Sequence, residues 1–344
     1  MNWNTYRKRF ALAASSKRYS EEDTRRALSY AKKILKNGLP VIFSANHLSL
    51  LVGIDVKYLY KASNDKNMRF YRSFSINKKR GGKRDINEPR PTLKSIQRWI
   101  LDNILCKVQI SHHAKAFRTQ SSIKDNARFH LKQDLVLRLD IKDFFPSIKS
   151  KSVYIIFRRL GYSKPVSRII TGILAPKSLP QGAPTSPALS NIFMKEADNR
   201  ISRYCMLHGI RYTRYADDLT FSGSFIAGDV ISFVRKIFSE YGLLLNENKT
   251  KLMKRHQRQS TTGITVNSFM NPSRKIRRKI RQIKYYINKY GITSHLNYIQ
   301  NDKVNYIQHV LGLVHHVLYV NPKDRDASSA RDMLYSLSSG QRDL

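Results

Sequence analysis

Two adjacent aspartates, Asp217 and Asp218, lie between two short segments with the residue types of β-strands, 212–215 and 219–222. The pair is therefore expected at the tip of a β-hairpin. Neighbouring carboxylates repel each other, and turn positions favour Asn or Gly. Two acids at such a tip suit the binding of a cation better than they suit folding stability.

A third carboxylate, Asp140, ends the apolar segment 135–141, which is typical of a buried strand. Mg²⁺ takes a few carboxylate ligands and completes its shell with water and substrate phosphates. Two such ions about 4 Å apart can stabilise both the attacking and the leaving oxygen of a phosphoryl transfer. The three aspartates thus predict a two-Mg²⁺ site for nucleotidyl transfer.

A second candidate group, residues 181–187, combines Gln181 and Gly182 with two prolines directly before a helical pattern at 186–207. A rigid loop of this kind can offer backbone N–H groups and the Gln181 amide to a nucleotide. Taken alone, the same pattern also suits an ordinary turn that caps a helix. Because the same chain also contains the three candidate metal-binding aspartates, the nucleotide-binding interpretation is favoured.

Strand and helix patterns alternate along the chain, which predicts an α+β fold around an antiparallel sheet. Strands are expected at 70–76, 135–141, 212–215 and 219–222, and helices at about 20–37, 49–62, 92–104, 151–160, 186–207, 230–241 and 304–319.

Positive charge dominates the composition: 63 Lys and Arg face 24 Asp and Glu, a net charge of +39. A protein this basic usually binds a polyanion. Residues 248–301 contain no acid, and a helix is expected there between Pro272 and Gly291. One face is a stripe of isoleucines for packing. The other faces are expected to contact nucleic-acid phosphates through Arg274, Arg277, Arg278, Arg281 and Lys284.

The two cysteines, Cys106 and Cys205, match no metal-binding spacing and no disulfide framework. The N-terminus lacks the apolar run of a signal peptide, and no stretch is long enough to span a membrane. We therefore expect a cytoplasmic protein with no membrane partner.

Three segments, in this order, resemble the core motifs of reverse transcriptases: Asp-Ile-Lys-Asp-Phe-Phe at 140–145, Gln-Gly-Ala-Pro-Thr-Ser-Pro at 181–187 and Tyr-Ala-Asp-Asp at 215–218. Residues 245–250 resemble the motif that follows them in bacterial members. The resemblance implies an RNA-directed DNA polymerase with a right-hand fold. The implied regions are an N-terminal helical region 1–65, fingers 66–135, palm 136–255 with part of the fingers inserted at about 150–185, and thumb 256–322. The remaining residues, 323–344, are polar and are expected to form a fraying C-terminal tail.

The resemblance also implies roles for single residues. Asp140, Asp217 and Asp218 would hold two Mg²⁺ ions, with the Ile141 carbonyl as a further ligand. Phe145 would be the steric gate that excludes ribonucleotides. The dNTP would be bound by Arg72, Lys83, Arg84, Gln181 and Lys249.

Two further segments resemble the retron branch of this family. Asn126-Ala-x-x-His130 fits a retron pattern, and Thr261-Thr262-Gly263 lies where retrons have Val-Thr-Gly, with Thr in place of Val. We assign Asn126 and His130 a structural or RNA-contacting role, and Thr262 and Gly263 an RNA-contacting one. The retron resemblance implies a cognate noncoding RNA (msr-msd) primed at an internal guanosine 2′-hydroxyl. The product is branched multicopy single-stranded DNA (msDNA), used in antiphage defence beside a separate effector protein.

Two alternatives stay open at this point. One is another bacterial reverse transcriptase of the group II intron, diversity-generating or abortive-infection kind. The other is a non-catalytic RNA-binding protein that has kept a polymerase fold. Branched RNA-linked DNA would separate the first alternative from a retron enzyme, and primer extension would exclude the second.

Overall fold

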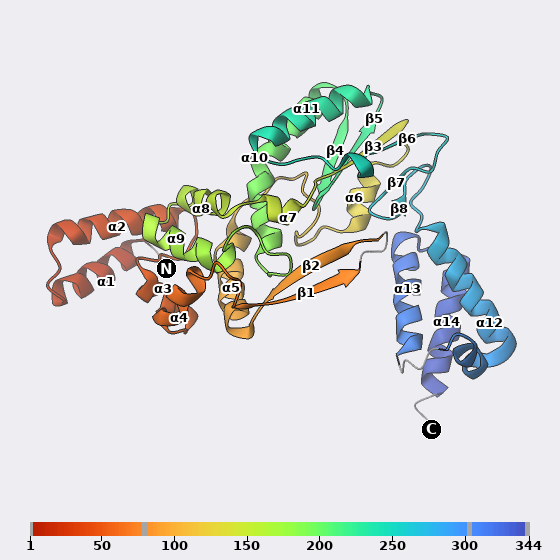
Figure 1. The fold of residues 1–344 in the computed structure, drawn as a ribbon, viewed down its shortest axis with the longest axis horizontal. Helices are drawn as coiled ribbons and strands as arrows, with labels where there is room; N and C mark the ends of the chain where they lie inside the picture. The colour runs from red at the N-terminus through yellow and green to blue at the C-terminus, as the bar shows by residue number, and fades with distance from the viewer. Residues whose placement is uncertain (1–2, 78–80, 301–304, 341–344) are drawn as a thin grey trace. The chain divides into compact units, whose positions relative to one another are not determined.

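The computed structural model describes residues 3–77, 81–300 and 305–340, which mix helices and strands as expected for an α+β protein (Figure 1). The chain divides into two compact units, each discontinuous in sequence. The first contains Met1–Phe117, Ile141–Ile201 and Ser232–Leu245, and the second contains Arg118–Asp140, Ser202–Ile231 and Asn246–Leu344. Helices α10 (Ser186–Leu207) and α11 (Ala227–Glu240) contribute residues to both.

The first unit is mainly helical and carries one antiparallel hairpin, β1 (Tyr71–Asn77) with β2 (Lys83–Pro89). Lys79 and Arg80, which lie between the two strands in the sequence, are outside the described residues. Its other elements are α1 (Trp3–Ser16), α2 (Glu21–Lys36), α3 (Ala45–Val52), α4 (Val56–Ser63), α5 (Pro91–Asn103), η1 (Leu105–Lys107), α7 (Phe144–Ser147), α8 (Ser150–Arg159) and α9 (Lys164–Leu174).

Two helices stand where one was expected at 49–62. Gly53 ends α3 with φ +68°, a left-handed conformation that glycine adopts without steric cost. Asp55 then starts α4, because its carboxylate accepts the backbone N–H of Lys57 at 2.6 Å.

The second unit is built on a four-stranded antiparallel sheet in the order β4-β5-β3-β6. The strands are β3 (Leu135–Asp140), β4 (Arg211–Tyr215), β5 (Asp218–Gly223) and β6 (Lys251–Lys254). Buried apolar side chains of β3 and β5, such as Leu139 and Leu219, point to one face, so Asp140 and Asp218 point to the other. Smaller elements of this unit are α6 (Ile123–Phe129), η2 (Glu247–Lys249), β7 (Ser260–Thr261) and β8 (Ile264–Thr265).

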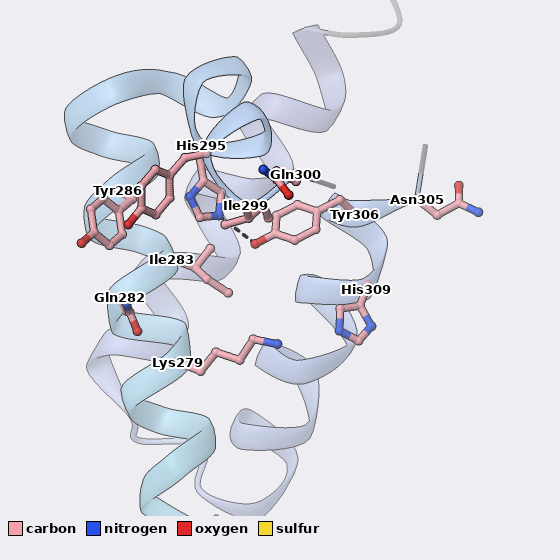
Figure 2. A pocket seen from close by; sticks show the side chains of 11 residues that line it. Lys279, Gln282, Ile283, Tyr286, His295, Ile299, Gln300, Asn305, Tyr306 and His309 are labelled. Atoms are coloured by element: carbon pink, nitrogen blue, oxygen red, sulfur yellow. Dashed lines mark hydrogen bonds between the residues drawn. The ribbon is translucent and has the colours of Figure 1, made fainter. Parts of the chain in front are cut away.

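A group of three helices follows: α12 (Arg274–Tyr298), α13 (Tyr306–Val320) and α14 (Arg325–Gly340). The predicted isoleucine stripe is confirmed, since Ile280, Ile283 and Ile287 are buried in the core of this group. The predicted stop at Gly291 is a kink with φ +76°, beyond which helical geometry resumes. After the kink, His295 Nε2 bonds Tyr306 Oη of α13 at 2.8 Å (Figure 2).

The expectation of a fraying C-terminal tail is wrong. Residues 325–340 form α14, and Ala327, Ala330 and Leu334 are buried in the helical core. Asp324 fixes the helix start: its Oδ1 accepts the Ala327 N–H at 3.1 Å, and its Oδ2 accepts a hydrogen bond from Arg277 Nε at 2.6 Å. A buried cap and an apolar stripe therefore hold a segment whose composition looks polar.

In the part of the chain that the structure describes, no helix combines the length and the apolar character needed to cross a membrane. Cys106 is an exposed free thiol and Cys205 a buried one.

Candidate active site

The three candidate carboxylates lie at one end of the sheet. Asp140 ends β3 directly opposite Asp218, the first residue of β5. Asp217 occupies the tight turn between β4 and β5, where Ala216 takes a left-handed φ of +59°. Antiparallel pairing thus brings together acids that are 77 or more positions apart in the sequence.

Their proximity has an electrostatic cost. Burial raises the pKa of Asp217, and the negative charges of Asp140 and Asp218 raise it further. A cation bound between these carboxylates would offset their mutual repulsion and so stabilise the site.

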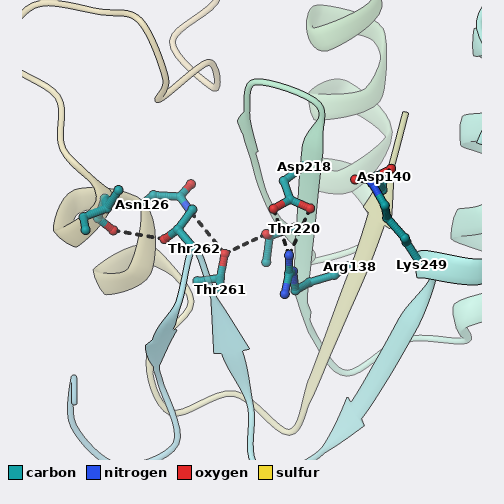
Figure 3. Close-up of polar contacts among 9 residues, drawn as sticks. Asn126, Arg138, Asp140, Asp218, Thr220, Lys249, Thr261 and Thr262 are labelled. Carbon is teal, nitrogen blue, oxygen red and sulfur yellow. Dashed lines mark hydrogen bonds and ion pairs between the residues drawn. The ribbon is translucent and has the colours of Figure 1, made fainter. Parts of the chain in front are cut away.

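Two basic side chains supply positive charge in the structure. Arg138 Nη2 donates to both oxygens of Asp218, at 3.0 and 2.8 Å (Figure 3). Lys249 Nζ donates to both oxygens of Asp140, at 2.8 and 2.9 Å. Lys249 was expected beside the nucleotide pocket, and in the structure its ammonium group contacts Asp140. Arg138 was missed, although a charged residue two positions before Asp140 on the same strand face was a usable signal.

Among the described residues, no three His, Cys, Asp or Glu side chains stand close enough to form a metal site as they are. Two of the three carboxylates are held in ion pairs, Asp218 with Arg138 and Asp140 with Lys249. The donor chemistry still fits a divalent ion: hard carboxylate oxygens on adjacent strand ends, with a mutual repulsion that the ion would relieve. The residues that would hold it are Asp140, Asp217 and Asp218, with the carbonyl of Ile141 next in the chain.

Arg214 stabilises the turn between β4 and β5. It is the largest fully buried side chain, and its Nη1 donates to the carbonyl of Ala216 at 3.0 Å. It projects from β4 on the apolar face of the sheet, beside Tyr212 and opposite Leu219 in register. Burying an arginine is costly unless its donors are used, so this residue fixes the turn that carries Asp217. Sequence reasoning missed it.

A buried polar network lies on the same sheet face as the carboxylates, further along the strands. Asn126 Nδ2 donates to Thr261 Oγ1 at 3.1 Å, and Thr261 Oγ1 bonds Thr220 Oγ1 at 2.9 Å (Figure 3). Thr213 Oγ1 donates to Asn126 Oδ1 at 2.7 Å and lies 2.7 Å from His130 Nε2. The network therefore ties α6 and β7 to the two strands that flank Asp217.

Donor counting fixes the state of His130 in this network. A hydroxyl has one hydrogen to donate, and that of Thr213 goes to Asn126. His130 must therefore carry its proton on Nε2 and donate it to Thr213. Its Nδ1 lies 2.7 Å from the hydroxyl of Ser222. The imidazole therefore cross-links β4 and β5.

This geometry corrects one expectation. Asn126 and His130 are fully buried, so the structure favours their structural role over contact with RNA. Thr262 is half-buried and Gly263 is exposed at the turn between β7 and β8, so both stay candidates for RNA contact. The unusual threonine at 261 also gains a reason: its hydroxyl bonds Asn126 and Thr220, which valine could not do.

Replacing Thr261 by valine is expected to lower the melting temperature by several degrees. The change keeps the side-chain shape but leaves buried polar atoms of Asn126 and Thr220 without this partner, at a cost of about 1–3 kcal/mol. Differential scanning calorimetry measures the effect. Thr265→Val is the matched control, since the Thr265 hydroxyl accepts a long 3.3 Å hydrogen bond from exposed Arg258. Equal melting temperatures for the two variants would contradict this account of the network.

The candidate nucleotide-binding residues Gln181, Arg72 and Arg84 belong to the first unit. The Gln181 carbonyl accepts the N–H of Asn87 on β2 at 2.7 Å. Gly182 has φ +121°, and a Cβ there would lie 3.0 Å from the Asn87 carbonyl oxygen and from a methyl of Ile86. The loop after Pro180 thus packs directly on the hairpin, which explains its glycine.

Strand alternation separates the basic candidates on that hairpin. Arg72 and Arg84 are exposed on the hairpin face that also carries Ile86, the neighbour of Gly182. Lys83 is exposed on the opposite face. The structure therefore brings Arg72 and Arg84 onto the side of the Gln181 loop and leaves Lys83 apart.

The two phenylalanines of the first motif differ as expected. Phe144 is buried, whereas Phe145 is half-buried and contacts the exposed ring of Phe117, with 6.4 Å between ring centroids. Phe145 therefore keeps a ring surface that a substrate could contact.

The basic residues of α12 are not equivalent. Arg274 and Arg278 are exposed, and Lys284 is half-buried. Arg277 pairs with the buried carboxylate of Asp324, so its guanidinium holds α14 and the prediction of RNA contact is not supported. Arg281 lies 3.5 Å from Asp326 in an exposed pair and remains a candidate, because exposed pairs are weak.

Comparison with known proteins shows the family of this chain. A family model described as reverse transcriptase (RNA-dependent DNA polymerase) matches residues 76–307, which include all three aspartates. The protein is therefore an RNA-directed DNA polymerase with a right-hand polymerase fold, and family membership implies dependence on a divalent metal ion.

Individual relatives narrow the class. The chain is 30% identical to the retron Mx65 reverse transcriptase of Myxococcus xanthus, with 93% of this chain and 78% of that protein covered. It is 33% identical to the retron Ec86 reverse transcriptase of Escherichia coli, with 83% of this chain and 87% of that protein covered. The chain belongs to the retron reverse transcriptases.

Proposed function

We propose that this enzyme copies one cognate noncoding RNA (msr-msd), starting from the 2′-hydroxyl of an internal guanosine, and produces branched msDNA. The observation that carries the proposal is the contact between the two retron-like segments. Ala127 of the first lies in one buried core with Ile264, which directly follows the second, and Thr262 Oγ1 of the second donates to the carbonyl of Ile123 in α6 at 3.4 Å. A shared packing unit of this kind suits a polymerase adapted to one dedicated RNA.

In the proposed reaction, the primer hydroxyl attacks the α-phosphate of a dNTP, a new P–O bond forms, and pyrophosphate leaves with the electrons of the broken bond. Two Mg²⁺ ions held by Asp140, Asp217 and Asp218 would stabilise the attacking and leaving oxygens. Arg214 keeps the turn of Asp217 in position through the Ala216 carbonyl. Lys249, with a side chain 53% exposed, neutralises Asp140 and is available to a nucleotide phosphate once that acid is otherwise engaged.

We assign the binding of the dNTP to Gln181, Arg72 and Arg84, which share one side of the β1–β2 hairpin. Exposed guanidinium groups suit the triphosphate, since they donate two parallel hydrogen bonds to phosphate oxygens. Lys83 is the weaker candidate because it points to the other face.

Phe145 is the proposed gate against ribonucleotides. Replacing it with alanine is expected to raise the ratio of UTP to dTTP incorporation by roughly ten- to a hundred-fold, because a ring that abuts the 2′ position is lost. Values of kcat/KM on poly(rA)/oligo(dT) measure the ratio. Phe269→Ala, at a phenylalanine that is 64% exposed, is the control and should leave it unchanged. An unchanged ratio in Phe145→Ala would remove Phe145 from this role.

By its retron relatives, we further propose a cytoplasmic role in antiphage defence. The RNA–DNA product would act beside a separate effector protein.

Branched priming has a direct test. The gene is expressed with its flanking noncoding region, and small nucleic acids are treated with a 2′–5′ debranching enzyme. We expect RNA-linked single-stranded DNA whose gel mobility changes on debranching and which is absent with Asp217→Asn. DNA insensitive to the debranching enzyme would refute guanosine 2′-hydroxyl priming while leaving the polymerase assignment intact.

A further inference from the structure

The helical group α12–α14 contains a pocket of about 620 Å³ that no part of the polymerase reaction uses (Figure 2). Its walls come from α12 on both sides of the Gly291 kink and from α13. Among the residues that the structure describes, no acidic side chain lines it. The side chains that matter here are Lys279, Gln282, Tyr286, His295, Tyr298, Tyr306 and His309.

One wall is aromatic and ordered. The ring of Tyr286 is near-parallel to those of His295 and Tyr298, with interplanar angles of 16° and 26° and centroid separations of 6.2 Å in both cases. His295 and Tyr306 are buried and fixed by their mutual hydrogen bond. Tyr298 is 79% exposed, so its flat ring faces solvent beside the buried pair of His295 and Tyr306.

The charges of the pocket restrict what it can bind. Lys279 extends its ammonium group between α12 and α13 (Figure 2). An aromatic cage for a cation would exclude such a charge, whereas a ligand with a phosphate benefits from it. Gln282 and His309 add hydrogen-bonding groups of the kind that recognise the edge of a base.

We infer that this pocket binds an unpaired nucleobase of structured RNA. The base stacks on Tyr298, its edge meets Gln282 or His309, and Lys279 contacts the neighbouring phosphate. Stacking on aromatic side chains is the usual way proteins hold unpaired RNA bases. The inference deepens the proposed function and rests on it, because it makes the helical region a reader of loops as well as of phosphates. Exposed Arg274 and Arg278 on the same helix provide the phosphate contacts around it.

The test uses the full-length protein and two fluorescent RNA hairpins with the same stem. One hairpin has an unpaired six-uridine loop, and the other has a loop of six abasic ribonucleotides. Tyr298→Ala is expected to weaken binding of the uridine hairpin about ten-fold and to leave the abasic hairpin unchanged. Tyr298→Phe should restore binding, because stacking needs the ring and not the hydroxyl.

Tyr285→Ala is the matched control: Tyr285 is 56% exposed on α12 and does not line the pocket. It should change binding of the two hairpins by the same factor. If Tyr298→Ala weakens binding of both hairpins equally, or of neither, the pocket does not bind a base. The same result is expected if the pocket instead binds a protein side chain. If the wild-type protein still binds the abasic hairpin tightly when the base pocket is overturned, the proposed RNA recognition stands. If neither hairpin binds the wild-type protein, the proposed function fails together with the inference.

Discussion

Replacing Asp217 by asparagine is expected to slow primer extension by roughly three orders of magnitude without a comparable loss of RNA binding. Metal-assisted stabilisation of transition-state charge contributes several kcal/mol, and each 1.36 kcal/mol corresponds to a factor of ten in rate. Asparagine keeps the shape of Asp217 but removes the negative charge that a divalent ion needs. Extension of oligo(dT) on poly(rA) with Mg²⁺ measures the rate, and fluorescence anisotropy on an RNA hairpin measures the binding.

The control for this prediction is Asp134→Asn. Asp134 immediately precedes β3, at the opposite end from Asp140, and its carboxylate lies in an exposed ion pair with Arg255 at 3.6 Å. It should leave the rate within about two-fold, because exposed pairs contribute little. An Asp217→Asn enzyme with the rate of the control would show that the turn between β4 and β5 is not the catalytic centre.

RNA affinity is expected to fall about a thousand-fold between 50 and 200 mM KCl. Such a slope follows if about six phosphates are neutralised by lysines and arginines, each releasing condensed counterions. The net charge of +39 and the exposed cations of α12 make that number of contacts accessible. Anisotropy titrations of one RNA hairpin over this salt range give the slope directly.

Two neighbouring arginines sharpen the salt experiment. Arg278→Gln should reduce the slope of log affinity against log salt by about one, since Arg278 is exposed and free to contact phosphate. Arg277→Gln should leave the slope unchanged and lower the melting temperature, because Arg277 pairs with buried Asp324. An affinity that does not depend on salt, or equal slopes for wild type and Arg278→Gln, would contradict phosphate contact by this helix.

Local patterns predicted the elements around the catalytic acids well. The strand 135–140, the hairpin 211–223 and the helix 186–207 were all visible from side-chain periodicity. Carboxylates at the ends of such strands were the chemical signal. Neither the periodicity nor the position of these carboxylates depends on distant parts of the chain.

Contacts between distant segments could not be predicted in the same way. Arg138 meets Asp218 only because β3 and β5 pair in one register, and a shift by one residue would point it to the other face. Asn126 and Thr261 are 135 positions apart, and nothing local to either shows that they share a hydrogen bond. The sequence therefore indicated the candidate metal ligands but not that Arg138 pairs with one of them.

The C-terminal segment shows the same limit. Its polar composition predicted fraying, but Asp324 caps α14 while it pairs with Arg277, 47 positions earlier. That one contact both orders the last helix and removes an arginine from the surface predicted to bind RNA.

The most direct test of the central claim is to purify the wild-type protein and Asp217→Asn from cells that carry the flanking noncoding region, and to sequence the RNA and DNA that accompany each. A retron reverse transcriptase predicts one structured RNA species with both proteins, and DNA complementary to that RNA with the wild type alone. A heterogeneous RNA population, or the same DNA with the inactive variant, would contradict the claim that this polymerase copies a dedicated RNA through Asp140, Asp217 and Asp218.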